Sequence, residues 1–454
     1  MTKSLFESFD EVSAKQWKQK IQFDLKGADY NEALIYKSLE SIDIKPFYNE
    51  EDISDIDHTI AHPTHWKNSI RIEVEDANTG NQKVEDALKK GAESIFFVIT
   101  DEQVDPATLF QNITKATSVF VQTRFLSEAY IQSIENIAKE QQLDIYILTD
   151  IINRLAETGN WFNNLNQDHE TLEQIAKSDT LKSCISIDTG LYQNAGATMI
   201  QQLAYGLAHA NEYLNHFDNK EQNPLKQSKV VFKVAIGGNY FFEIAKLRAL
   251  RLLWESLAPA YGAIKDCSII AYPSHRNKTI LDYNVNMLRT TTECMSGILG
   301  GADFIYNLRY DDIYNLDNDF GTRISLNQLL ILKNESYFDL VENPASGSYY
   351  IESLTNQLAE KALSLFKDIE ENGGFLHQLK SGTIQKKIKE SAKKEQELFD
   401  QEKIVLTGTN KYKNQEETAP TFQKSVFLER NVRKTLLEPV IKRRLSEIME
   451  KNMH

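Results

Sequence analysis

Short apolar runs alternate with helical patterns along most of this chain, and this alternation limits the possible folds more than any other feature. We interpret eight apolar runs as buried strands, at residues 94–99, 118–121, 144–148, 184–187, 230–236, 267–272, 303–306 and 338–341. Continuous apolar strands separated by amphipathic helices are typical of a parallel sheet. Eight such units are the number that closes a (β/α)8 TIM barrel, while an open doubly wound sheet has the same periodicity. The sequence therefore predicts an α/β fold, with the barrel as the first interpretation.

The composition divides the chain into three parts. Residues 1–60 form an arm in which aromatic side chains such as Trp17 need another surface, either a partner subunit or the chain's own barrel. Residues 61–375 hold the alternating strands and helices of the predicted barrel. Residues 376–454 hold too few apolar residues for a second core, so we expect a helical extension whose last helix spans 436–449.

Charge and cysteine content exclude several classes of protein. The 454 residues carry a formal net charge of −14, and a chain this acidic repels the phosphate backbone of nucleic acids. Only three cysteines occur, without metal-ligand spacing, which is typical of a reduced cytoplasmic protein. No run approaches the roughly 20 apolar residues that a membrane span needs. We therefore predict a cytoplasmic protein with neither a nucleic-acid nor a membrane partner.

The segment after the fourth apolar run is the first place to look for chemistry. It has the pattern of strand, loop and helix, and such loops carry catalytic side chains in α/β enzymes. The loop reads Gln-Asn-Ala-Gly-Ala-Thr over residues 193–198 and is similar to a barrel loop of methylmalonyl-CoA mutase. Further runs similar to that family lie at residues 232–249, 288–295, 299–301, 319–324 and 343–350. The resemblance covers most of residues 1–415 and implies the mutase barrel.

Residues that act in the family's catalytic chain are replaced here. The resemblance aligns Gly190 with the family's Tyr and Leu191 with its His, and neither side chain can donate a proton or a hydrogen bond. A further His of the family aligns with Tyr306. Residues 161–182, where the catalytic chain grips coenzyme A with a segment rich in Arg, Tyr and Pro, contain none of these three residue types. The resemblance therefore implies that this chain has no catalytic residues.

The same resemblance bears on the cofactor. Cobalamin-dependent mutases ligate cobalt through the His of an Asp-x-His-x-x-Gly motif on a separate C-terminal domain. None of the nine His residues here has an Asp two positions before it, and the residues after the predicted barrel are too few for such a domain. We therefore expect this chain to bind no cofactor and no metal. The adenosylcobalamin of the assembled enzyme would be held by a large subunit.

Three further features have both a functional and a structural interpretation. His275 and Arg276 follow a predicted strand, and we favour a loop pair neutralised by neighbouring carboxylates. The Gly pair at 237–238 could cradle a phosphate, but a tight turn is the commoner use of such a pair. Arg289 and Glu293 share one helix face and are predicted to pair with each other.

The leading hypothesis is that this chain is the small, non-catalytic subunit of a heterodimeric methylmalonyl-CoA mutase. Its large catalytic subunit would interconvert methylmalonyl-CoA and succinyl-CoA by adenosylcobalamin radical chemistry. One alternative is an acyl-CoA mutase barrel that becomes active when a separate cobalamin-binding subunit docks. A second alternative is a homodimeric scaffold protein without catalysis.

Overall fold

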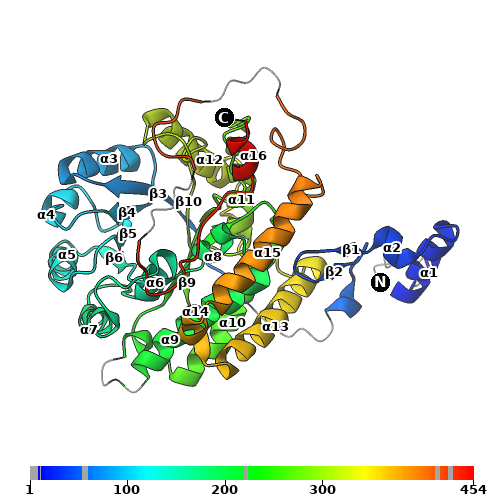
Figure 1. Ribbon diagram of the computed structural model, residues 1–454, viewed down its shortest axis with the longest axis horizontal. Helices are drawn as coiled ribbons and strands as arrows, with labels where there is room; N and C mark the ends of the chain where they lie inside the picture. The colour runs from blue at the N-terminus through cyan, green and yellow to red at the C-terminus, as the bar shows by residue number, and fades with distance from the viewer. Residues whose placement is uncertain are drawn as a thin grey trace, which may run out of the picture.

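Eight parallel strands form one sheet that is nearly closed into a barrel, with helices outside it (Figure 1). The computed structural model describes residues 9–10, 12–53, 60–218, 220, 223–414, 420–427 and 433–453. The strands are β3 (Lys67–Val74), β4 (Ser94–Ile99), β5 (Ser118–Thr123), β6 (Asp144–Ile147), β7 (Ser186–Asp188), β8 (Val231–Ile236), β9 (Ser268–Pro273) and β10 (Phe304–Tyr306). Their order in the sheet is β6-β5-β4-β3-β10-β9-β8-β7.

The two end strands of that order, β6 and β7, meet through the backbone just before β7 begins. Tyr146 and Ser183 form a parallel bridge. The Ile147 N–H donates to the Ser183 carbonyl at 2.8 Å, and the Lys182 N–H donates to the Ile145 carbonyl at 2.8 Å. Because these bonds join the first and last strands, the predicted (β/α)8 barrel is confirmed over the open sheet.

Helices fill the connections between successive strands and form the outer layer. They are α3 (Ala77–Lys89), α4 (Pro106–Leu109), α5 (Glu128–Gln141), α6 (Ile151–Thr158), α7 (Leu165–Ile175), α8 (Gly190–Ala195), α9 (Met199–Phe217), α10 (Tyr240–Leu257), α11 (Val285–Leu299) and α12 (Asp319–Asn334). The helix α9 begins at a capping box between Thr198 and Gln201. Within the described ranges, no helix is both long and apolar enough to cross a membrane.

One of the eight predicted strands is wrong. Residues 338–341 form a loop after α12, in which Leu340 and Val341 are 72% and 62% exposed. The strand that was missed is β3, where polar residues separate the apolar ones. Its polar side chains have partners, as when the Lys67 amine donates to the Ser118 hydroxyl at 3.0 Å. The predicted number of strands was therefore right, but one segment was misassigned.

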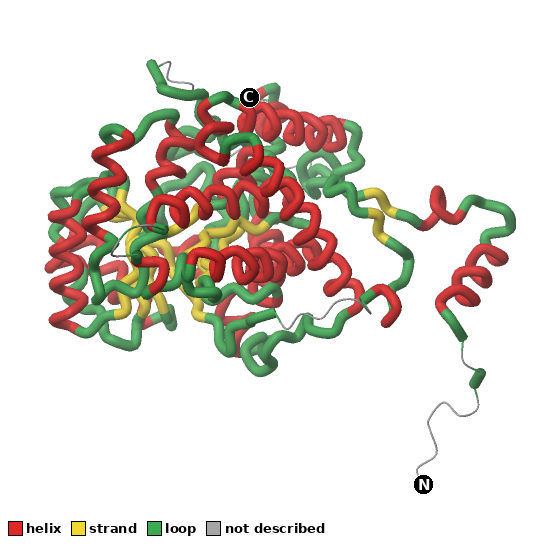
Figure 2. Tube along the Cα trace, turned by 90° about the horizontal axis from the view of Figure 1, so that it is seen from below, coloured by secondary structure: helices red, strands yellow, loops and turns green. Residues whose placement is uncertain are grey.

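The N-terminal arm projects from the barrel (Figures 1 and 2). It contains α1 (Ala14–Asp24), α2 (Tyr30–Leu34) and the antiparallel pair β1 (Tyr36–Lys37) and β2 (Asp43–Ile44). At the root of the arm, the Glu40 carboxylate accepts the Met199 and Ile200 N–H groups at 2.8 and 3.0 Å. At its tip, α1 has no buried residue. The tip of the arm therefore stands away from the barrel, whereas its root, with Glu40 and the buried Ile42, packs onto it.

Three helices of the C-terminal part pack against the barrel helices. They are α13 (Tyr349–Glu371), α14 (Gly374–Lys380) and α15 (Thr383–Asp400). Leu354, Phe375 and Ile388 from these helices belong to the same buried apolar cluster as residues of α9 and α10. These helices therefore extend the barrel's outer core.

The predicted last helix at 436–449 is wrong over most of its length. Only α16 (Glu447–Lys451) is helical, and the preceding segment runs extended across the carboxyl ends of the strands. Its backbone N–H groups bond to the barrel: Val440 donates to Ala156 at 2.8 Å, and Leu445 donates to Arg276 at 2.8 Å. Pro439 also opposes a helix here, because it disfavours helical geometry in the residue before it. The barrel mouth therefore has a cover made from the chain's own C-terminal segment.

Candidate functional site

The loop after β7 holds the two positions that the sequence analysis aligned with catalytic residues. Gly190 begins α8, and its N–H donates to the Asp188 carboxylate at 3.0 Å. A Cβ atom added to Gly190 would lie 1.9 Å from the hydroxyl oxygen of Tyr272. Leu191 is 1% exposed and belongs to the apolar core. The space above Gly190 is therefore filled by a tyrosine from β9, and Leu191 packs away from solvent.

Aromatic side chains from several strands fill the barrel interior. The rings of Tyr272 and Tyr306 stack with centroids 5.0 Å apart and an interplanar angle of 7°. Phe96 contacts Tyr306 with centroids 5.2 Å apart, and Phe120 contacts Phe304 at 4.6 Å. Burial raises the pKa of both Tyr272 and Tyr306 well above the ordinary value, so both stay protonated at neutral pH. The interior is a packed core, with Tyr306 inside it.

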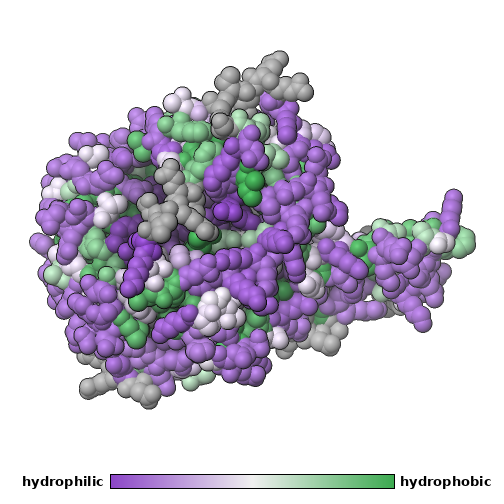
Figure 3. Space-filling view, in the orientation of Figure 1, coloured by the Kyte–Doolittle hydropathy of each residue, from purple (hydrophilic) through white to green (hydrophobic). Residues whose placement is uncertain are grey.

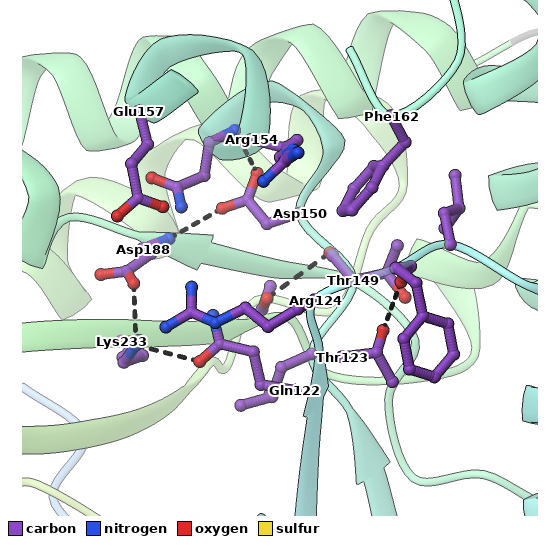
Figure 4. Close-up of a pocket in the computed structure, with 15 residues that line it drawn as sticks. Gln122, Thr123, Arg124, Thr149, Asp150, Arg154, Glu157, Phe162, Asp188 and Lys233 are labelled. Atoms are coloured by element: carbon purple, nitrogen blue, oxygen red, sulfur yellow. Dashed lines mark hydrogen bonds and ion pairs between the residues drawn. The ribbon is translucent and has the colours of Figure 1, made fainter. Parts of the chain in front are cut away.

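A lysine covers this aromatic core at the carboxyl ends of the strands (Figure 4). The Lys233 amine donates to the Asp188 carboxylate at 2.8 Å and to the Gln122 side-chain oxygen at 3.2 Å. It also lies 5.5 Å from the ring centroid of Phe96 and 5.3 Å from that of Tyr272. Burial lowers the pKa of Lys233, and the charge of Asp188 opposes that shift. The Lys233 amine, which lies over the aromatic core, thus already has a carboxylate partner.

A second buried network centres on Asp150, which follows β6. Its carboxylate accepts hydrogen bonds from His209 Nε2 at 2.9 Å, from the Tyr213 hydroxyl at 2.9 Å and from the Asp188 N–H at 2.9 Å. The other ring nitrogen of His209, Nδ1, lies 3.0 Å from the Tyr192 hydroxyl. His209 and Tyr192 are fully buried. Both ring nitrogens of His209 therefore have a partner. The network fixes the position of Asp150 at the end of β6.

Lys233, Asp188, Asp150 and His209 were not predicted as site residues from the sequence. Asp188 and Asp150 could have been noted, because each stands at the carboxyl end of an apolar run, where barrel enzymes place reactive groups. Their assembly around a shared centre depends on which strands are neighbours, and one sequence does not provide that.

Little open space remains directly over the ends of β5, β6, β7 and β8. The cavity bounded by the ends of β5, β6, β7 and β8 has a volume of about 40 Å³, whereas pockets for drug-sized ligands have about 300–1,000 Å³. The C-terminal segment closes one side, because the Lys442 amine donates to the Glu157 carboxylate at 2.5 Å. Burial alone would raise the pKa of Glu157, but Lys442 and the neighbouring cations lower it to about 2. An acyl-CoA does not fit into this cavity.

His275 and Arg276 both have carboxylate partners, as expected. His275 Nε2 lies 2.8 Å from the Asp312 carboxylate. The Arg276 guanidinium donates to Glu395 of α15 at 2.7 and 2.9 Å and to the Arg443 carbonyl at 2.7 Å. Arg276 therefore anchors α15 and the C-terminal segment, which cover the mouth.

Two other expectations had different outcomes. The pairing of Arg289 with Glu293 is wrong, because the Glu293 carboxylate accepts from the buried Lys278 amine at 2.7 Å instead. The Gly pair at 237–238 forms a turn, and the Gly237 N–H donates to the Glu243 carboxylate at 2.8 Å. A phosphate would have to displace that carboxylate.

Histidines offer no evident place for cobalt. Three of the described ones are already bonded: His209 to Asp150, His216 to Glu173 at 3.0 Å and His275 to Asp312. Among the described residues, no group of three or more His, Cys, Asp or Glu side chains is arranged to hold a metal ion.

Comparison with known proteins agrees with this barrel. The family model described as Methylmalonyl-CoA mutase matches residues 100–453. This chain belongs to the methylmalonyl-CoA mutase family. A relative named the methylmalonyl-CoA mutase small subunit of Porphyromonas gingivalis is 31% identical over 446 residues, covering 91% of this chain and 72% of that protein. Another small subunit, from Streptomyces virginiae, is 34% identical over 234 residues, or 50% of this chain and 38% of that protein.

Longer members of the mutase family match over a smaller part of their length. The methylmalonyl-CoA mutase of Rhizobium meliloti is 36% identical over 254 residues, which cover 55% of this chain and only 36% of that protein. The large subunit of Porphyromonas gingivalis is 35% identical over 235 residues, covering 50% of this chain and 33% of the large subunit. The chain thus spans about a third of the length of these mutases.

Proposed function

We propose that this chain is the small, non-catalytic subunit of a heterodimeric methylmalonyl-CoA mutase. The complex would interconvert methylmalonyl-CoA and succinyl-CoA with adenosylcobalamin bound by its large catalytic subunit. Relatives named small and large subunit occur together in Porphyromonas gingivalis, which supports a two-subunit arrangement. Three free and buried cysteines suit a reducing cytoplasm.

The observation that carries the proposal is the filled barrel. The Tyr272 hydroxyl occupies the space next to Gly190, so a larger side chain at that position would collide with it. Beneath it, Tyr306 and its aromatic neighbours pack the barrel interior, and the cavity beside Asp188 and Lys233 measures about 40 Å³. The larger cavity of about 370 Å³ lies between α15 and the C-terminal segment. Catalysis needs substrate held beside reactive groups in a water-free pocket. A barrel packed in this way suits a structural role.

The cofactor follows from the same reasoning. The family's cobalt-ligating motif is missing from the sequence, and the described histidines near the mouth are engaged with carboxylates. We therefore assign adenosylcobalamin to the large subunit and no cofactor to this chain. Its contribution to the enzyme is an interface and a stable companion barrel.

The N-terminal arm is the surface we assign to the partner. Apolar side chains gather on it (Figure 3), and Phe9, Phe23 and Tyr36 are 73%, 79% and 65% exposed. Exposed apolar side chains in one projecting segment are typical of a binding surface. The large subunit would cover them, because α1 has no buried residue in the chain by itself.

Activity measurements with separated chains test the proposal. The purified chain is mixed with adenosylcobalamin and methylmalonyl-CoA, alone and together with a large mutase subunit from the same genome. We expect no isomerisation by this chain alone, and a stable complex with the large subunit. Turnover by the isolated chain with adenosylcobalamin would refute the proposal.

Two further measurements address the alternatives. Saturable binding of a coenzyme A ester, together with activity when only a cobalamin-binding protein is added, would favour a catalytically competent barrel. Sedimentation of a stable homodimer that does not associate with the large subunit would favour a scaffold without catalysis. The filled interior argues against the first outcome, and the exposed arm is compatible with either kind of partner.

A further inference from the structure

Two arginines at the barrel mouth lie beside the cavity without a carboxylate partner. Arg124 follows β5, and Arg154 lies on α6 next to Asp150. In Figure 4, Arg124 lies below Asp150 and Arg154 above it. Neither side chain has an ion pair or a hydrogen bond among the described residues. The buried Nε atom of Arg154 is left without an acceptor.

Arg154 is half-buried and Arg124 is exposed, and both differ from the buried arginines, which are paired. Each of four buried guanidinium groups has a carboxylate oxygen within 2.7 Å, namely those of Arg248, Arg251, Arg276 and Arg444. A buried donor without an acceptor costs about 1–3 kcal/mol, and more for a charged group. Arg154 instead lies on the ring of Phe162, with its guanidinium carbon 5.0 Å from the centroid. The stacking orients the guanidinium but provides no acceptor.

The carboxylates of the cavity are committed elsewhere. Asp188 accepts Lys233 at 2.8 Å, and Glu157 accepts Lys442 at 2.5 Å. Asp150 already accepts several bonds, from His209, Tyr213 and two backbone N–H groups. None of these three carboxylates therefore forms an ion pair with Arg124 or Arg154.

Further positive charge lies close by. Burial lowers the pKa of Arg154; Glu157 opposes that shift, while Arg433 and Arg124 add to it. The Arg433 guanidinium is itself held at the mouth, because it donates to the Thr158 carbonyl at 2.8 Å. Arg433 and Arg124 therefore repel the charge of Arg154, and an anion between the guanidinium groups would relieve this repulsion.

We propose that this cavity binds a small oxyanion, a carboxylate or a phosphate group, between Arg124 and Arg154. A guanidinium presents a planar fork of N–H donors that matches both groups bidentately. The cavity of about 40 Å³ has the right size, because about 10–15 Å³ of such space holds one water molecule. The site is independent of the proposed subunit role, since it depends only on this chain's own side chains.

Binding of inorganic phosphate and of acetate to the full chain tests the site. Each probe is titrated by calorimetry against chloride at constant ionic strength, so that screening does not change. We expect saturable binding of at least one probe by the wild-type chain. R124Q and R154Q should each weaken it about tenfold or more, because a hydrogen bond to a charged group contributes about 1.5–3 kcal/mol. R154K keeps the positive charge but loses the planar pair of N–H donors, and it should therefore retain part of the binding.

The exposed Arg323 on α12 supplies the matched control, since it has no described ion pair and lies outside the cavity. R323Q should bind within about twofold of wild type. R124Q guards against a folding artefact, because Arg124 is exposed and its side chain holds no other described residue.

Binding of phosphate alone would assign the site to phosphoryl groups, and binding of acetate alone to carboxylates. Absence of saturable binding of both probes would overturn the proposal. So would equal weakening in R323Q, which would reduce the effect to general surface charge.

Discussion

Gly190→Ala tests the central observation, the filling of the barrel beside this glycine. Gly190 begins α8, where alanine is ordinarily better than glycine by about 0.5–1 kcal/mol. The added Cβ would, however, lie 1.9 Å from the Tyr272 hydroxyl oxygen and 3.0 Å from an Asp188 carboxylate oxygen. Overpacking of this kind costs about 1–3 kcal/mol. We therefore expect the variant to be less stable than wild type by about 1–2 kcal/mol, the opposite sign from the helix preference.

A double-mutant cycle with Tyr272→Phe identifies the cause. Removing the hydroxyl leaves two close contacts of the added Cβ, with the ring carbon Cζ at 2.9 Å and with the Asp188 oxygen at 3.0 Å. Gly190→Ala should then cost at least about 1 kcal/mol less in the Tyr272→Phe background than in wild type, because residues in contact couple by about 0.5–3 kcal/mol. Urea unfolding followed by circular dichroism measures all four free energies of unfolding.

Gly238→Ala is the control for the same end of the barrel. Its added Cβ would meet its nearest neighbour, the Asn277 amide nitrogen, at 3.4 Å, which is ordinary contact. It should change the free energy of unfolding by less than about 0.5 kcal/mol. If Gly190→Ala stabilises the wild-type chain, or costs the same in the Tyr272→Phe background, then the space above Gly190 is open and our account of the barrel fails.

Three other substitutions test separate parts of the structure. Glu157→Gln should cost about 1–2 kcal/mol at pH 7, allowing for the 27% exposure of the side chain. Because the pKa of Glu157 is lowered from 4.5 to about 2, the difference from wild type should shrink in urea titrations as the pH falls from about 4.5 toward 2, and a constant difference would refute the Lys442 pairing. Asp188→Asn should cost about 3–5 kcal/mol by leaving the Lys233 charge unpaired, and a smaller loss in the double variant with Lys233→Met would confirm that cause. Phe23→Ser should leave the stability of the isolated chain within about 0.5 kcal/mol and weaken association with the large subunit about tenfold, as measured by surface plasmon resonance; unchanged association would remove the arm tip from the interface.

The strands could be predicted wherever burial made them continuously apolar. The run 94–99 matches β4 residue for residue, and all six of its side chains are buried. The strand β3 was missed because its polar side chains have partners distant in sequence, such as Glu93, whose N–H donates to the Asn68 side-chain oxygen at 3.0 Å. Residues 338–341 were misread for the opposite reason, because periodicity does not distinguish an exposed apolar loop from a buried strand.

The site was predictable in part. Resemblance located Gly190 and Leu191, but the ring that fills the space above Gly190 comes from Tyr272, 82 positions further along the chain. Spacing on one helix suggested that Glu293 pairs with Arg289, whereas the fold supplies Lys278, which lies outside the helix. In both cases a tertiary neighbour replaced the partner that local sequence indicated.

A substrate pocket requires empty volume and polar groups that have no partner until a ligand binds. Both features lower the free energy of unfolding of the ligand-free protein. At the mouth of this barrel, Tyr272 fills volume, and Asp188 and Lys233 satisfy each other. Such a barrel completes its core without any ligand. Binding is then expected where groups still lack partners, which here means the exposed apolar arm for a protein and the guanidinium groups of Arg124 and Arg154 for a small anion. The two surfaces are chemically distinct, so losing one should leave the other intact.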